Sequence, residues 1–190
     1  MIEASLLLAH KTIKTVAPLL HLTANVKGAD DDMLYTGRLL YLADKHHLLY
    51  YGRTITRDEH IRIQGGPIGE LAFEVSDTWK VSLSGFYRSK LPTEKAGEYL
   101  SKSDEGSLAF VIEKFAAMPR GKFYGYIRSL PEWKKVEDLF QLKDEEDRYR
   151  IRRLPMDRMD MLLLPDGDHY FNVSAEHVAE TRRFMTGEFD

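Results

Sequence analysis

Adjacent histidines, His46 and His47, are the side chains in this sequence that most resemble a metal-binding pair. Two side chains on one helix share an ion when they stand three or four residues apart, because that spacing puts them on one face. Neighbouring helical positions point about 100 degrees apart, and neither histidine is followed by another four residues later. The sequence therefore predicts no metal site, and we expect one ring at the edge of the core and the other exposed.

Other groups with catalytic potential stand in contexts that favour ordinary roles. The Gly65–Pro67 turn could present N–H groups to an anion, but it lacks the Lys and Ser or Thr of a phosphate loop, and proline has no N–H. Acidic pairs at 104–105 and 145–146 lie in polar runs, where carboxylates are normally solvated. Ser84 lacks the glycine pattern of a nucleophile elbow. We predict no catalytic residue and no cofactor, so an enzyme is not expected.

Aromatic side chains are the more suggestive group, because large rings near element ends can serve both a core and an interface. We expect most of them to close the core and a few to contact another protein together with nearby arginines such as Arg53 and Arg88. The rings near expected element ends are Tyr50, Tyr51, Trp79, Phe86, Tyr87, Phe123, Tyr124, Tyr126 and Trp133.

Composition restricts the class of protein further. The chain has 190 residues, no cysteine, 27 Lys and Arg, and 30 Asp and Glu, for a net charge of -3. Without cysteine it can form no disulfide, thiol nucleophile or iron–sulfur cluster. A nucleic-acid-binding protein normally carries a basic stripe, whereas the arginines of segment 148–153 directly follow acidic residues 144–147. Nucleic acid is therefore not an expected partner.

The sequence also argues against a membrane or an export route. A membrane-spanning helix needs about 18 or more apolar residues in a row, but Glu3, His10 and Lys14 interrupt the first apolar segment. The same segment lacks the basic start and the small-residue cleavage site of a signal peptide. We expect a cytoplasmic protein that is neither exported nor bound to a membrane.

Apolar periodicity predicts the elements that carry these groups. A first helix extends to about Leu20, with Pro18 expected to kink it or end it early. Asp30–Asp32 can cap a second helix that runs to about Tyr51 and is apolar on most sides, so it should be central and buried. Gly52 would end that helix in a left-handed conformation.

The middle of the chain mixes extended and helical signals. Alternation over 59–64 predicts a short extended piece, and Gly65–Pro67 predicts a turn whose proline opens a third helix. Segment 81–99 predicts a strand or an irregular loop. Ser101–Asp104 has the spacing of a capping box, for a helix that ends at Pro119–Gly121.

The C-terminal part should contain a short helix over 131–140 and a final helix that Ser174 caps and Gly187 ends. Between them, the apolar runs of segment 161–173 flank turn residues and predict a β-hairpin. The fold class is therefore α+β, mainly α-helical: a single compact domain over residues 1–190, with a central buried helix and a small antiparallel sheet or hairpin.

Segment 37–67, GRLLYLADKHHLLYYGRTITRDEHIRIQGGP, resembles the Panacea domain of the SocA-like antitoxin family. The family pattern there is a hydrophobic helix reading roughly K-L-L-Y-x-A-D and ending in Y-G-R, then an extended piece, G-P and another helix. A Pro-Glu-Trp segment follows, here residues 131–133, so the resemblance covers roughly residues 33–138. Arg38 departs from the lysine or glutamine that the family more often has. The motif residues in this chain are Asp44, Tyr51, Gly52, Arg53, Gly66, Pro67 and Trp133.

The resemblance implies an antitoxin that neutralises a cognate toxin, encoded beside it, by direct protein–protein binding. A proteolytic adaptor that delivers the toxin to a Clp-type protease is the alternative, and a small-molecule enzyme with its pocket at 51–67 is a lesser one. The motif residues are candidates for partner binding, although Asp44 and Arg53 could simply pair across the helix end. Residues 139–190 do not map to the family and are expected to form an extension packed on the same core.

Overall fold

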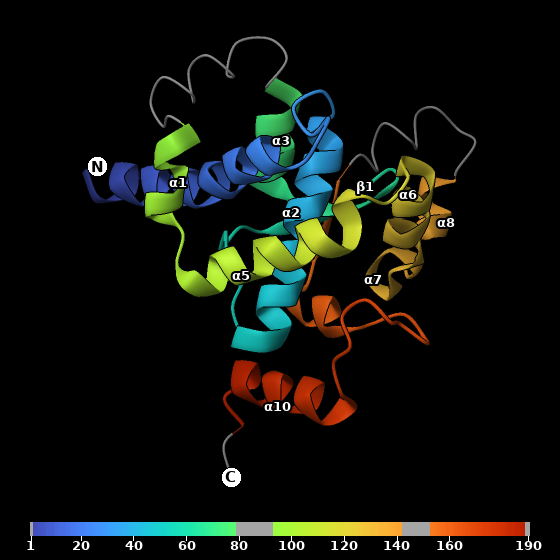
Figure 1. Ribbon diagram of the computed structural model, residues 1–190. Helices are drawn as coiled ribbons and strands as arrows, with labels where there is room; N and C mark the ends of the chain where they lie inside the picture. The colour runs from blue at the N-terminus through green and yellow to red at the C-terminus, as the bar shows by residue number, and fades with distance from the viewer. Residues whose placement is uncertain (1, 79–92, 142–152, 189–190) are drawn as a thin grey trace.

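The computed structural model describes residues 2–78, 93–141 and 153–188, with side chains for 12–76, 95–141 and 153–188 (Figure 1). It is a mainly helical α+β fold with a small antiparallel sheet, which confirms the predicted fold class. The α-helices are α1 (Ile2–Asn25), α2 (Met33–Tyr51), α3 (Glu70–Thr78), α5 (Lys102–Val111), α6 (Arg120–Ser129), α7 (Pro131–Lys134), α8 (Glu137–Phe140) and α10 (Ala175–Thr186). The other elements are the 3-10 helices η2 (Thr93–Tyr99) and η4 (Arg158–Leu162), the π-helix η3 (Ile112–Ala116), and strands β1 (His60–Ile63), β2 (Gly66–Gly69) and β3 (Leu154–Met156).

Helix α2 runs through the middle of the molecule, and most of its residues are buried (Figure 1). Asp32 caps it by accepting a hydrogen bond from the N–H of Tyr35 at 3.0 Å, the role predicted for the acidic cluster. Helices α1, α3, α5 and α10 all pack against α2. Fully buried leucines such as Leu39 and Leu42 place it in the hydrophobic core, so the prediction of a central buried helix is confirmed.

The sheet has the order β2-β1-β3, with both pairings antiparallel. Strand β1 confirms the predicted extended piece. Its polar residues His60 and Arg62 are nevertheless buried together with Ile61 and Ile63. In a half-solvated strand the polar side chains would face water. In β1 they are buried because the strand is paired on both sides and its polar side chains form hydrogen bonds inside the protein.

The prediction that Pro67 opens a helix is wrong. Gly66 and Pro67 belong to β2 and pair with β1, and proline is tolerated there because β2 is an edge strand. Helix α3 begins at Glu70 instead. Its first turn is capped from a distance, since the carboxylate of Asp58 accepts a hydrogen bond from the N–H of Leu71 at 2.8 Å.

The β-hairpin predicted within 161–173 is also wrong. Helix η4 occupies the start of this segment, and the remainder, which the structure describes in full, contains no strand before α10. The carbonyls of Met161 and Leu163 accept hydrogen bonds from the ammonium of Lys45 at 2.8 and 2.6 Å, which tie the start of this segment to α2. The third strand is β3, which pairs with β1.

In the N-terminal half, α1 continues through Pro18 to Asn25, so the proline does not end the helix early. The capping box is confirmed: the hydroxyl of Ser101 accepts the N–H of Asp104, and the Asp104 carboxylate accepts the N–H of Ser101. Of the segment predicted as a strand or an irregular loop, 81–99, residues 81–92 lie outside the described residues; the remainder forms the 3-10 helix η2, so the prediction is wrong there. Within the described ranges, no helix is both long and apolar enough to cross a membrane.

The C-terminal half contains both agreements and differences. Helix α5 continues into η3 and stops before Pro119, as expected, but Gly121 lies inside α6, a helix that the sequence analysis does not predict. The predicted helix over 131–140 is present as the two short helices α7 and α8. Ser174 caps α10 and Gly187 ends it with φ 72°, as predicted.

Two buried cations join the segment containing β3 and η4 to the rest of the core. Lys45 of α2 forms an ion pair with Glu132 of α7 at 2.8 Å, and both side chains are fully buried. Arg62 of β1 donates to the carbonyls of Glu132 and Pro155 at 2.7 and 2.8 Å and pairs with Asp160. Buried charges are tolerated when their hydrogen bonds are satisfied, so these contacts hold the segment in place.

Candidate partner-binding site

The turn that ends α2 positions the Tyr51-Gly52-Arg53 motif. Gly52 is left-handed, with φ 67°, and its N–H donates to the carbonyl of Leu48 at 2.9 Å. A side chain here would be strained, and its Cβ would lie 2.7 Å from the ring of Phe184 in α10. Glycine therefore both ends the helix, as predicted, and allows α10 to approach.

Tyr51 and Arg53 flank this glycine at the protein surface. The exposed fractions are 50% for Tyr51, 39% for the Arg53 side chain and 60% for Phe184. The Tyr51 ring packs on the ring of His47, with 4.5 Å between centroids. Together, Tyr51, Gly52, Arg53 and Phe184 are named the aromatic edge.

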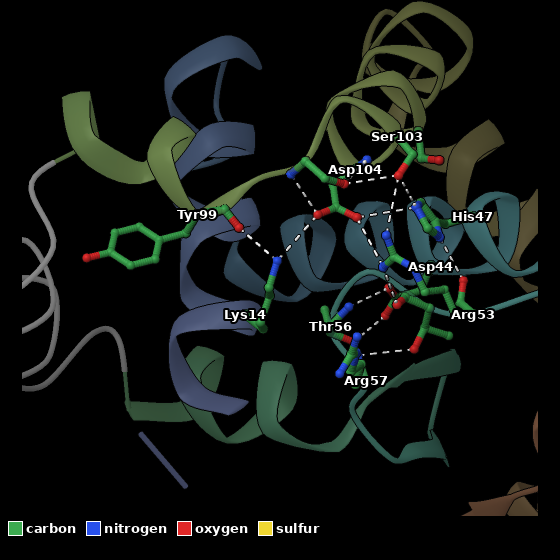
Figure 2. A network of polar contacts seen from close by, with 12 residues as sticks. Lys14, Asp44, His47, Arg53, Thr56, Arg57, Tyr99, Ser103 and Asp104 are labelled. Atoms are coloured by element: carbon green, nitrogen blue, oxygen red, sulfur yellow. Dashed lines mark hydrogen bonds and ion pairs between the residues drawn. The ribbon is translucent and has the colours of Figure 1, made fainter. Parts of the chain in front are cut away.

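Beside the aromatic edge, a buried carboxylate gathers basic side chains from different elements (Figure 2). Asp104 of α5 is fully buried and lies 3.4 Å from both Lys14 of α1 and Arg53, and 3.2 Å from Nε2 of His47. Burial alone would raise the pKa of Asp104. Hydrogen bonds with Ser101 and the charges of Lys14 and Arg53 outweigh burial, so the pKa is lower than its ordinary value and the group is ionised.

The hydrogen bonds of His47 define where its proton lies. Nδ1 is 2.7 Å from the carbonyl oxygen of Arg53, which can only accept, so Nδ1 carries the hydrogen. Nε2 lies 3.1 Å from the hydroxyl oxygen of Ser103, which can donate to it, and 3.2 Å from a carboxylate oxygen of Asp104. Burial lowers the pKa of His47 and favours the neutral ring. The positive charge facing Asp104 is therefore supplied by Lys14 and Arg53.

Asp44, the acidic residue of the motif, is buried in α2 and contacts the segment that follows it (Figure 2). Its carboxylate accepts the N–H and the hydroxyl of Thr56 at 3.1 and 2.6 Å and lies 3.2 Å from Nε2 of His60. The alternative that Asp44 pairs with Arg53 is wrong, because Arg53 pairs with Asp104. Asp44 instead fixes the path of the chain between α2 and β1.

Gly66 and Pro67 are buried in β2, where they serve packing between the sheet and α6. Gly66 has φ 138°, and a Cβ on it would lie 2.2 Å from Cγ2 of Ile127. The guanidinium of Arg38 lies against the Gly65–Gly66 turn and donates to the carbonyl of Gln64 at 3.1 Å. The turn thus faces a protein cation, which agrees with its predicted structural role.

Trp133 is buried in α7 and packs on Phe140, with 4.8 Å between ring centroids. Its neighbour Glu132 accepts the hydroxyl of Tyr41 at 2.5 Å as well as the ammonium of Lys45. Tyr51 and Arg53 are therefore the motif residues whose side chains reach the surface, while the others are buried or, for Gly52, shape the turn.

The rings of His46 and His47 contact different neighbours. The His46 ring stacks on Phe110 at 4.0 Å and its Nδ1 contacts the hydroxyl of Ser107 at 2.9 Å, and burial lowers the pKa of His46 to about 4. His47 is fully buried, and His46 is half-buried. The expectation of one exposed ring is wrong, because α5 covers both. Among the described residues, no cluster of three or more potential ligands could hold a metal.

Sequence reasoning missed the basic residues that organise this site and the core beneath it. Lys14, Lys45 and Arg62 were not singled out, nor was their acidic partner Glu132. A signal for Lys45 existed: a lysine within a helix expected to be buried needs an acidic partner, since lysine is rarely buried alone. That partner, Glu132, lies 87 residues away in the sequence. Local sequence pattern therefore cannot identify it.

The protein is mainly helical, and its motif forms an exposed helix end that carries aromatic and arginine side chains. These residue types are enriched at protein interfaces. The chain belongs to the SocA-like antitoxin family: the family model described as "Antitoxin SocA-like, Panacea domain" matches residues 38–134, from α2 to α7. No curated protein and no solved structure matches the chain. Family membership suggests an antitoxin role, implies a toxin as partner and favours a non-enzymatic function.

Proposed function

We propose that this protein is an antitoxin that neutralises a toxin encoded beside it by binding the toxin directly. The observation that carries the proposal is the match of the antitoxin family model to half of the chain. The surface position of Tyr51 and Arg53 supports it, since tyrosine and arginine are among the residues that dominate binding energy at protein interfaces.

In this proposal some motif residues bind the toxin and others maintain the structure around them. Tyr51 and Arg53 contact the toxin, and Gly52 sets the direction of the chain between them. Asp44, Pro67 and the remaining buried members, Gly66 and Trp133, keep the surrounding elements in position. Substitutions at the buried positions should mainly lower stability, whereas substitutions at Tyr51 or Arg53 should mainly lower affinity for the toxin.

The experiment that tests the proposal is co-expression with the neighbouring reading frame. The product of that frame should stop growth when expressed alone and should be harmless in the presence of this protein. A Tyr51→Ala, Arg53→Gln variant that remains folded should protect less well. Toxicity that the wild-type protein leaves unchanged would contradict an antitoxin function.

The level of the toxin during protection separates direct blocking from the adaptor mechanism. Direct blocking predicts that the toxin accumulates as a complex and that protection persists in cells without Clp-type proteases. Toxin that disappears, with protection lost when the protease is deleted, would replace direct blocking with delivery to a Clp-type protease.

A further inference from the structure

The guanidinium of Arg53 is held loosely for a charged group beside a carboxylate. Its contacts to Asp104, Ser103 and the carbonyl of Thr54 measure 3.4, 3.3 and 3.5 Å, longer than the roughly 2.7–2.9 Å of charge-assisted hydrogen bonds. Arginine has five N–H donors, and more than a third of this side chain is exposed. Arg53 can therefore bind a further acceptor at the surface.

Arg53 shares its carboxylate partner with a second cation. Asp104 lies within ion-pair distance of two permanent cations, Lys14 and Arg53, while His47 is neutral. Within the described parts of the chain, neither cation has a second carboxylate partner. At Asp104 itself, one carboxylate thus faces two cations, and the N-terminus of α5 adds a partial positive charge beside it.

Aromatic side chains border this positive charge. Tyr51 stands two residues before Arg53, with its exposed ring packed on His47, and the exposed ring of Phe184 lies against the Gly52 turn between them. Apolar groups around a charge exclude water when a partner binds, and a charge pair is stronger where water is excluded. The site thus favours an anionic group that arrives with an apolar surround.

We propose that the aromatic edge receives an acidic side chain of the toxin, an Asp or Glu whose carboxylate binds Arg53 while neighbouring apolar residues cover Tyr51 and Phe184. This inference rests on the proposed antitoxin function and adds the chemistry of the contact. Arginine binds carboxylates through two parallel hydrogen bonds. A phosphate backbone is a poorer occupant, because it requires an extended basic stripe and the chain carries a net charge of -3.

Charge reversal at one arginine tests this contact. The affinity of full-length protein for the product of the neighbouring reading frame is measured for wild type, Arg53→Glu and Arg128→Glu, since Arg128 is an exposed arginine of α6 and its reversal changes the net charge equally. We expect Arg53→Glu to raise the Kd by about tenfold or more and Arg128→Glu to change it by less than about twofold. The ratio of the Kd of Arg53→Glu to the Kd of wild type should become smaller at high salt, because salt screens the charge interaction.

Thermal unfolding shows whether each variant is folded. Arg53→Gln replaces Arg53→Glu if the latter is unfolded. Unchanged binding by a folded Arg53 variant, or an equal loss in Arg128→Glu, would overturn the inference while leaving the antitoxin function intact. Failure of wild type to bind would count against the antitoxin function itself. A short DNA duplex that binds wild type but not the Arg53 variant, with toxin binding unaffected, would identify nucleic acid as the occupant and reject a toxin carboxylate.

Discussion

Lys45 shows how one charged side chain can organise a core that the surrounding residues make apolar. Its ammonium is fully buried, and its three hydrogens go to Glu132 and to the carbonyls of Met161 and Leu163. An ammonium with every donor used can remain charged away from water. The same contacts join α2 to α7 and to the segment around η4.

Replacing this lysine should be costly. Lys45→Met leaves the carboxylate of Glu132 buried without its cationic partner, and removing one member of a buried pair costs about 3–5 kcal/mol. Lys134→Met is the control, since Lys134 is exposed and forms a surface pair with Glu137 that is worth about 1 kcal/mol at most. Urea unfolding measures both. Equal stability losses in the two variants would show that the buried pair contributes no more than a surface pair.

Asp58 gives the fold a pH dependence of a defined sign. Burial raises its pKa from 3.8 to about 6, although His60 and the N–H groups of Leu71 and Ala72 act in the opposite direction. The folded state therefore binds the proton more tightly than the unfolded state, so stability falls as pH rises from about 4 to about 6.

Asp58→Asn removes this titration. Relative to the variant, wild type should lose up to about 3 kcal/mol of unfolding free energy between pH 4 and pH 7, on the order of two pKa units. Unfolding of both proteins by denaturant across this range measures the difference. If the difference in unfolding free energy between wild type and Asp58→Asn does not change with pH, Asp58 keeps an ordinary pKa in the folded protein.

At the residue scale, the sequence predicts caps better than partners. Asp32, Ser101 and Gly52 act within a few residues of themselves, so their spacing alone predicts the helix ends. The choice of Asp104 as the partner of Arg53, or of Glu132 as the partner of Lys45, depends on elements that meet only in the folded chain.

At the element scale, tertiary contacts overrode two local signals. The Gly66–Pro67 pair has the chemistry of a helix start, yet pairing with β1 makes it an edge strand. The segment after η4 has the pattern of a hairpin, but Lys45 binds the carbonyl of Leu163 at its start and Phe171 is buried in the core. Tertiary contacts therefore determine the backbone conformation of these segments, and it differs from the conformation that local propensity predicts.

The contact between β2 and α6 predicts opposite effects for two glycines. Gly66→Ala places a Cβ at 2.2 Å from Ile127 at φ 138°, which should cost about 2 kcal/mol or more through strain and overpacking. Gly125→Ala within α6 meets no atom within 4 Å and should stabilise the helix by about 0.5–1 kcal/mol. Thermal unfolding of the two variants measures this contrast, and destabilisation of similar size at both positions would contradict it.

At the scale of the whole molecule, residues beyond the family match share the core and the aromatic edge with residues inside it. Met156, Met161 and Phe171 belong to the same hydrophobic cluster as α2. Thr181 and His177 of α10 hydrogen-bond to the carbonyl of Leu49 at 2.9 and 2.8 Å. A family motif and α10 thus build one surface, which the resemblance alone does not predict because α10 lies outside it.

Direct binding between purified proteins tests the central claim most closely. Full-length protein is titrated with the product of the neighbouring reading frame, and complex formation is followed by calorimetry and size-exclusion chromatography. A toxin-neutralising interface of standard size, about 1,200–2,000 Å², predicts a complex of fixed stoichiometry with a Kd on the order of micromolar or tighter. Two folded proteins that stay separate at such concentrations, while the neighbouring product remains toxic in cells that contain both, would contradict the account.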